Sequence, residues 1–199
     1  MTEVADCYSG GERRWMEMGQ RLRARALAPL LSLSCRVGVR PAHVTFASLV
    51  TGLAACFTLG TAPGLALGLL AAHVLLDGLD GPLARRLGTA GRRGSLTDTA
   101  VDQVVVTATA LALASEGLVG AAAAGAYSTT YLAVVALAMV RNALAVPYSW
   151  LVRPRFVVYA WIPVELWLWP GTIEPLIVAA SVLLGWKALT GFLAVRRRL

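Results

Sequence analysis

Four of the five aspartates in this chain fall within 26 residues, in the stretch that runs from Asp77 to Asp102. Asp77 and Asp80 are three residues apart, and Asp98 and Asp102 are four apart, so each pair lies on one face of a helix. The surrounding sequence is strongly apolar, and a carboxylate at the centre of a membrane span costs about 2.5 to 3.5 kcal/mol. Ionisable side chains in such apolar sequence are usually functional, so we interpret the stretch as a functional site.

The potential metal ligands in this stretch are all oxygen atoms, apart from the imidazole of His73, one helical turn before Asp77. Such a set favours Mg²⁺ or Mn²⁺ over zinc. Four carboxylates can hold two ions about 3.5 to 4 Å apart, which stabilises the attacking and leaving oxygens in phosphoryl transfer. His73 either approaches these ions or, as we favour, packs or bonds between helices. Since Cys7, Cys35 and Cys56 lack metal-type spacing and a pairing pattern, we expect neither zinc nor disulfides.

The elements that must position these acids are transmembrane helices. Of the 199 residues 57% are hydrophobic and 15% are charged, and the mean hydropathy is +0.66. About 20 helical residues cross the hydrocarbon core of a bilayer. We therefore predict an all-α membrane protein with six transmembrane helices, at residues 42–60, 64–86, 95–115, 120–147, 156–170 and 175–195. Residues 1–37 form a cytoplasmic N-terminus in this prediction, and residues 38–199 form the membrane domain.

The basic residues predict the orientation of these spans. They lie before the first span, between the second and third, between the fourth and fifth, and after the sixth, whereas the other connections contain no Lys or Arg. The positive-inside rule places both termini and the aspartate-bearing turn in the cytoplasm. Glu3, Asp6 and Glu12 argue against a signal peptide. The dominance of arginine over the single Lys187 favours a bacterial cell membrane.

An amphipathic helix is predicted before the first span. Apolar residues recur there at spacings of three and four, namely Trp15, Met18, Leu22, Ala26, Leu30 and Leu33. Arginines on another face suit anionic headgroups, so we expect the helix to lie in the membrane interface. An ordinary solvated helix is the alternative.

Small residues and one arginine separate the two acidic pairs. Gly81, Ala84 and Gly94 let a ligand approach the backbone, but small residues also serve close helix packing. Arg85 can bind a diphosphate, neutralise Asp98 or extend to the interface. Taken singly, these residues decide nothing.

Taken together, the pattern DxxDGxxAR, eight intervening residues and GxxxDxxxD resembles the signature of the CDP-alcohol phosphatidyltransferases at every fixed position. The matching residues are Asp77, Asp80, Gly81, Ala84, Arg85, Gly94, Asp98 and Asp102. Six spans, an amphipathic N-terminal helix and cytoplasmic termini extend the similarity to most of the chain. Upstream, Pro41 and Thr45 are similar to a further family motif, although Ala42 stands where asparagine is usual. Pro41 is explained equally well as a helix starter.

The resemblance implies a site with two divalent cations, Mg²⁺ or Mn²⁺. Asp77, Asp80 and Asp98 would bind them, and Asp102 would complete the second metal site and act as the base. The acceptor hydroxyl would attack the β-phosphorus of a CDP-alcohol, usually CDP-diacylglycerol, and CMP would leave. The residues around the cytidine diphosphate would be Pro41, Thr45, Gly81, Ala84, Arg85 and Gly94. Relatives of this kind suggest a homodimer.

The acceptor alcohol is not identified by the motif. Arg141 lies inside the fourth span, and Arg153 and Arg155 follow on the same side. They are candidates for binding an anionic acceptor such as glycerol 3-phosphate, inositol phosphate or phosphatidylglycerol. Positive-inside topology explains Arg153 and Arg155 equally well. Glu165, in the fifth span, either pairs with an arginine such as Arg141 or lies near a helix end in water, and we favour a structural role for it.

Two other functions remain open at this stage. An intramembrane prenyltransferase also binds a diphosphate through Mg²⁺ and aspartates, but it needs two acidic motifs and a longer chain, and it releases pyrophosphate rather than CMP. A divalent-cation transporter needs polar groups along a path through the bilayer, and beyond Arg141 and Glu165 the outer halves of the spans are apolar. No nucleic-acid partner is expected, because topology accounts for the net charge of +7.

Overall fold

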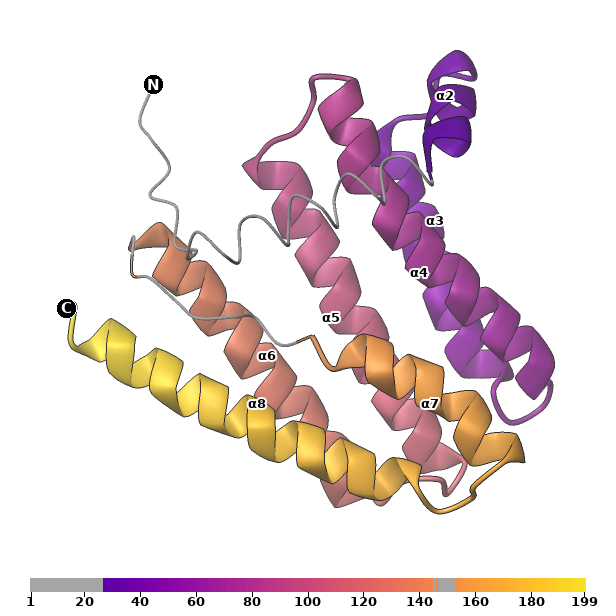
Figure 1. Cartoon of the computed structure of the whole chain (residues 1–199), viewed down its shortest axis with the longest axis vertical. Coiled ribbons are helices and arrows are strands. Elements are labelled where there is room, and N and C mark those ends of the chain that lie inside the picture. The colour runs from indigo at the N-terminus through magenta and orange to yellow at the C-terminus, as the bar shows by residue number, and fades with distance from the viewer. Residues whose placement is uncertain (1–26, 145, 147–152) are drawn as a thin grey trace. The chain divides into compact units, whose positions relative to one another are not determined.

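The structure, a computed structural model, describes residues 27–144, 146 and 153–199. Within them it contains seven α-helices and no strand (Figure 1). This confirms the predicted all-α class. The helices are α2 (Ala28–Arg36), α3 (Pro41–Thr58), α4 (Pro63–Arg86), α5 (Arg92–Ser115), α6 (Ala121–Ala143), α7 (Arg155–Trp167) and α8 (Ile173–Arg196).

Five of these helices, α3, α4, α5, α6 and α8, are long and apolar enough to cross a membrane. The predicted span at 156–170 corresponds to α7, which has only 13 residues. At 1.5 Å per residue α7 is about 20 Å long, shorter than the hydrocarbon core of about 30 Å. The predicted amphipathic helix lies mostly outside the described residues. Its last turns fall in α2, where Leu30 and Leu33 are exposed.

Proline and glycine set the boundaries of the helices α3 and α4. Pro41 and Pro63 stand in the first turns of α3 and α4, where the missing N–H costs nothing. Gly88 ends α4 with φ +67°, a left-handed conformation that glycine adopts without strain. The amide of Thr89 then donates to the carbonyl of Ala84 over 2.9 Å. The chain can therefore turn within a few residues and begin α5.

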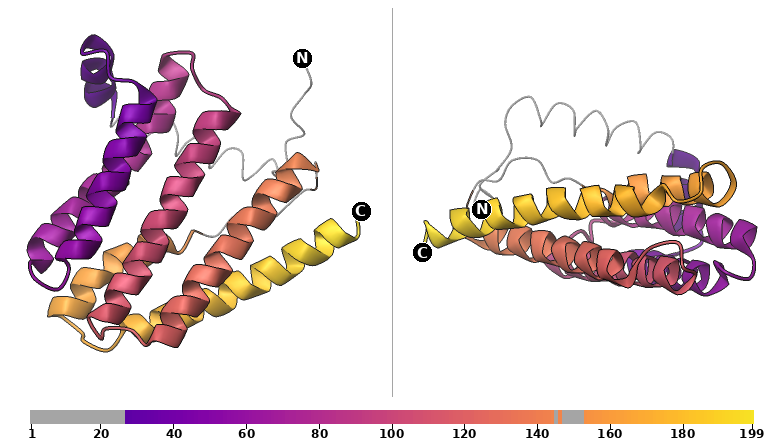
Figure 2. Two further views of the ribbon diagram at one scale, coloured as in Figure 1. Left: turned by 180° about the vertical axis from the view of Figure 1, so that it is seen from behind. Right: turned by 90° about the horizontal axis from the view of Figure 1, so that it is seen from below.

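The described residues form two compact units, the first ending at Ala112 and the second beginning at Leu113. In the first unit α3 and α4 are an antiparallel pair that lies side by side (Figures 1 and 2). Leu31 of α2, Val44 of α3, and Leu79 and Leu83 of α4 form a buried apolar cluster. The short helix α2 is thereby fixed against the end of α4 that carries the first two aspartates.

The second unit contains α6, α7 and α8. Helices α6 and α8 lie side by side in both views (Figures 1 and 2). The buried residues of α6 recur at spacings of three and four, as expected for one packed face: Ala124, Tyr127, Tyr131 and Val134. Arg155 and Glu165 of α7 are also buried, at 1% and 3% exposure.

Glu165 anchors the start of α8. Its carboxylate accepts backbone N–H bonds from Gly171 over 2.6 Å and from Thr172 and Ile173 over 2.8 Å each. These amides have no partner inside a helix that begins at Ile173, and a carboxylate there complements the helix dipole. The buried charge is thus used structurally, as the sequence led us to expect.

We predict that Glu165→Gln destabilises the protein by about 1.5 to 3 kcal/mol, because a neutral amide replaces a carboxylate that accepts several buried hydrogen bonds. Thermal unfolding of the detergent-solubilised protein measures this loss. Glu174→Gln is the matched control, since Glu174 stands exposed in the first turn of α8. Equal melting temperatures for the two variants would show that Glu165 does not anchor the helix.

Candidate metal and nucleotide site

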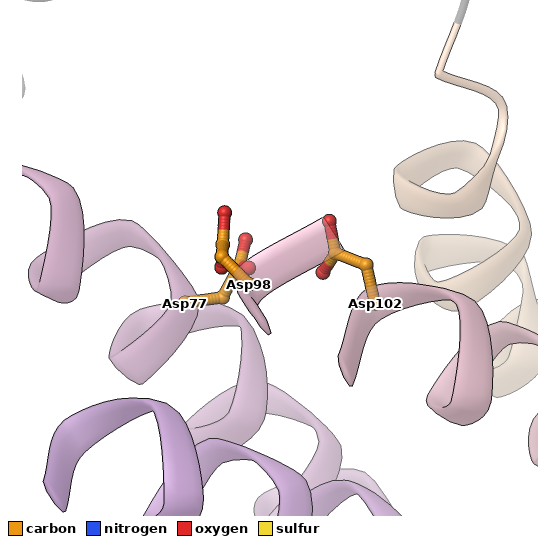
Figure 3. Close-up of side chains that lie close together, drawn as sticks. All are labelled: Asp77, Asp98 and Asp102. Atoms are coloured by element: carbon orange, nitrogen blue, oxygen red, sulfur yellow. The ribbon is translucent and has the colours of Figure 1, made fainter. Parts of the chain in front are cut away.

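Three of the four motif aspartates converge within the first unit. Asp77 comes from α4, and Asp98 and Asp102 come from successive turns near the start of α5 (Figure 3). One carboxylate oxygen from each lies within 4.8 Å of the others, and all three residues are half-buried. The arrangement follows from the sequence, because the end of α4 and the beginning of α5 are brought to the same level by the turn at Gly88.

Asp80 is held differently from the other three. It is only 6% exposed, and its Oδ2 accepts a hydrogen bond of 2.8 Å from Thr45 Oγ1 on α3. Asp77 and Asp98 are its acidic neighbours. Sequence reasoning placed all four aspartates in one cluster and Thr45 against the nucleotide. In this structure Asp80 adjoins Asp77 and Asp98 of that cluster, and the Thr45 hydroxyl orients its carboxylate.

A cavity of about 340 Å³ opens beside Asp80 and Asp98. All six residues predicted to surround cytidine diphosphate line it, namely Pro41, Thr45, Gly81, Ala84, Arg85 and Gly94. A Cβ atom added at Gly94 would meet no other atom within 4 Å, so a larger residue there would occupy the space of the cavity. The glycine is therefore suited to the close approach of a ligand.

The turn between α4 and α5 contributes lining residues that the motif did not single out. Thr89 and Gly91 lie in this turn, and Ser95 and Thr97 follow in the first turns of α5. They are exposed, hydroxyl-bearing or small, which the sequence alone cannot distinguish from an ordinary polar turn. The only signal in the sequence for these lining residues is that their turn joins the two helices that carry the aspartates.

His73 belongs to the first unit, and the candidate acceptor arginines belong to the second. His73 is 1% exposed and bonds to Ser48 of α3, which confirms the expected interhelical contact. Arg153 is exposed, whereas Arg155 is buried, with its guanidinium carbon 4.6 Å from the centroid of the Phe156 ring. Arg141 is half-buried on α6. The three arginines belong to the second unit.

Comparison with known proteins identifies the class of this chain. The family model of the CDP-alcohol phosphatidyltransferases matches residues 39–192. No curated protein matches the chain in a sequence comparison. The chain therefore belongs to the CDP-alcohol phosphatidyltransferase family, and it is a membrane-bound transferase of phospholipid synthesis. This excludes the prenyltransferase and transporter alternatives.

Two crystal structures share its fold. One is the phosphatidylinositol phosphate synthase PgsA1 of Mycobacterium tuberculosis in complex with manganese and citrate, which is 20% identical, covers 84% of this chain and 88% of that chain, and has a TM-score of 0.71. The other is the same synthase with CDP-DAG bound, which is 21% identical, covers 88% and 92%, and has a TM-score of 0.62. At these identities the likeness shows the shared fold.

We predict that Thr45→Val lowers kcat/KM for the CDP-alcohol at least tenfold. The variant leaves the buried Asp80 carboxylate without its hydroxyl donor, and a hydrogen bond to a charged group contributes about 1.5 to 3 kcal/mol. Thr45→Ser keeps the hydroxyl and is expected to stay within about threefold of wild type, an estimate from the retained bond. CMP release under initial-rate conditions measures both variants, and equal losses in the two would contradict the role of the hydroxyl.

Proposed function

We propose that this chain transfers a phosphatidyl group from CDP-diacylglycerol to an anionic alcohol and releases CMP. The proposal rests on one observation, that predicted nucleotide-binding residues and motif aspartates line the same cavity. All six residues predicted to contact the nucleotide line one cavity, and two of the four motif aspartates, Asp80 and Asp98, stand in its wall. A nucleotide diphosphate in this cavity would meet the acidic cluster at its edge.

The donor set of the cluster fits a hard divalent cation. Oxygens on opposite sides of one Mg²⁺ are about 4.2 Å apart, twice the Mg–O distance, so carboxylate oxygens within 4.8 Å of one another are close to the required size. We propose that Asp77, Asp80 and Asp98 hold two ions, Mg²⁺ or Mn²⁺, and that Asp102 completes the second site. Bound ions would neutralise charge on the phosphoryl oxygens and align the acceptor for displacement.

The remaining residues position the substrate and move one proton. Gly81, Ala84 and Gly94 leave room for the base and sugar, and the Arg85 guanidinium suits the diphosphate oxygens. Asp102, one turn after Asp98 on α5, takes the proton of the acceptor hydroxyl. As that oxygen bonds to the β-phosphorus, the bond to the CMP oxygen breaks. Water remains at the cytoplasmic surface, and the acyl chains stay in lipid.

The acceptor we propose is phosphorylated or otherwise anionic. Support comes from Arg155, which is 1% exposed beside Tyr127. An arginine that serves only topology can extend into water, as the exposed Arg153 does. We propose that Arg155 of α7 and Arg141 of α6 serve an acceptor such as glycerol 3-phosphate, inositol phosphate or phosphatidylglycerol.

We also propose six crossings with both termini and the site in the cytoplasm, in a bacterial cell membrane. The basic residues after α4 and those at the end of α8 share one side only if the chain crosses an even number of times between them. In this topology the predicted span at 156–170, which includes α7 and the residues that follow it, supplies the sixth crossing. A homodimer is expected from the family.

The most direct test of this function is CMP release by the purified protein with CDP-diacylglycerol, Mn²⁺ and a panel of alcohols. We expect glycerol 3-phosphate, inositol phosphate or phosphatidylglycerol to support turnover. The matching unphosphorylated glycerol or inositol should react at least tenfold more slowly, since loss of one charged hydrogen bond costs about 1.5 to 3 kcal/mol. Mass spectrometry identifies the lipid product. Turnover with uncharged alcohols alone would contradict the acceptor class, and no CMP with any alcohol would contradict the donor.

Two aspartate variants separate binding from chemistry. We predict that Asp102→Asn still binds CDP-diacylglycerol but loses turnover at least about 100-fold, the usual contribution of a general base. Asp98→Asn should lose metal-dependent binding as well. Equilibrium binding with Mn²⁺ and with EDTA is measured beside CMP release for each variant. A near-normal rate for Asp102→Asn would remove it from the role of base.

A further inference from the structure

Helix α3 carries none of the four aspartates, yet it is bonded to α4 one helical turn from them. Ser48 of α3 and His73 of α4 are both 1% exposed. His73 Nδ1 lies 3.0 Å from the Ser48 carbonyl oxygen and 2.9 Å from Ser48 Oγ, and Ser48 Oγ donates to the His73 carbonyl over 3.2 Å. Because a carbonyl oxygen can only accept, the bond to the Ser48 carbonyl uses the tautomer of His73 that carries its hydrogen on Nδ1. The pair thus joins the two backbones reciprocally.

The next turn of α3 brings the same helix against α5. A Cβ atom added at Gly52 would lie 2.7 and 2.8 Å from the two methyl carbons of Val105, and 3.1 Å from His73 Nδ1. Val105 is fully buried. No side chain fits at Gly52 without moving one of these neighbours. Cys56, one turn further, also approaches α5, with its sulfur 3.6 Å from Thr109 Oγ1.

The residues in this contact lie one turn from the acidic cluster on both α4 and α5. His73 precedes Asp77 by four residues on α4, and Val105 follows Asp102 by three on α5, so each shares a face with its aspartate about one turn, or 5.4 Å, away. A shift of α4 or α5 at Gly52 is therefore passed to the carboxylates. Mg²⁺ accepts little deviation from octahedral distances of 2.0 to 2.1 Å.

We propose that Ser48, Gly52 and His73 form a positioning contact that sets the separation of α4 and α5 and thereby the affinity of the aspartate cluster for a divalent cation. The inference rests on the proposed metal site. None of the three residues binds the ion or the substrate. They fix how far Asp77 stands from Asp98 and Asp102, as the outer shell of a metal site does for its ligands.

A pair of compensating substitutions tests the proposal on the full-length protein in detergent, with Mn²⁺ alone as the probe. Electron paramagnetic resonance of free Mn²⁺ gives the dissociation constant. We expect Gly52→Ala to weaken Mn²⁺ binding at least fivefold. Adding Val105→Ala, which removes the two colliding methyl groups, should return the constant to within twofold of wild type. Gly68→Ala is the matched control, since a Cβ there meets no atom within 4 Å.

Substitutions at His73 test the same contact without adding a side-chain atom. They test the positioning role even if Gly52→Ala does not fold. His73→Asn keeps an N–H group near the position of Nδ1 and should retain Mn²⁺ affinity within threefold, whereas His73→Leu should lose at least fivefold. If the contact were purely structural, the substitutions would lower the melting temperature, but His73→Asn would not retain more Mn²⁺ affinity than His73→Leu.

The outcomes separate the two proposals. Wild-type affinity in folded Gly52→Ala, or equal constants for His73→Asn and His73→Leu, overturns the positioning contact and leaves the metal site in place. Absence of saturable Mn²⁺ binding by the wild type overturns the proposed metal site and this inference with it.

Discussion

The arrangement of this protein depends on the cost of gathering four carboxylates at the ends of apolar helices. Like charges at this distance repel, and each loses hydration as it leaves water. The chain meets this cost by placing the acids where α4 ends and α5 begins, next to a cavity and the tight turn at Gly88. In our account, bound divalent cations offset the remaining cost of repulsion and lost hydration. A bound cation removes the repulsion between the carboxylates, and this favours its binding.

The four carboxylates are not equivalent, and the difference has a physical basis. Asp80 is buried and already oriented by Thr45 from the neighbouring helix. Asp77, Asp98 and Asp102 are half-buried and close together. One acid is therefore oriented by a neighbouring helix, and the other three share the space where charge must be neutralised. Helix α3 supplies the fixed reference for both parts, through Thr45 at the level of the acids, Ser48 one turn further along the helix and Gly52 two turns further.

Much of this was predictable from sequence because the signals are local. Hydropathy placed five spans within a few residues, and Pro63 and Gly88 mark the ends of α4. The convergence of Asp77 with Asp98 and Asp102 follows from an antiparallel pair joined by a short turn. The hydrogen bond that orients Asp80 was not predictable from local signals, because its partner Thr45 lies 35 residues earlier on another helix. Nor was the shortness of α7, where Glu165 binds the start of α8 and the chain leaves the helix at Trp167.

The central claim is that the aspartate cluster is a two-ion site for a CDP-linked donor. Counting bound Mn²⁺ by equilibrium dialysis, with CDP-diacylglycerol present, tests it most directly. The account predicts about two ions per chain for the wild type, from the number of carboxylates that a two-ion site requires. It also predicts a lower count in Asp98→Asn. No saturable Mn²⁺, or an unchanged count in Asp98→Asn, would contradict it.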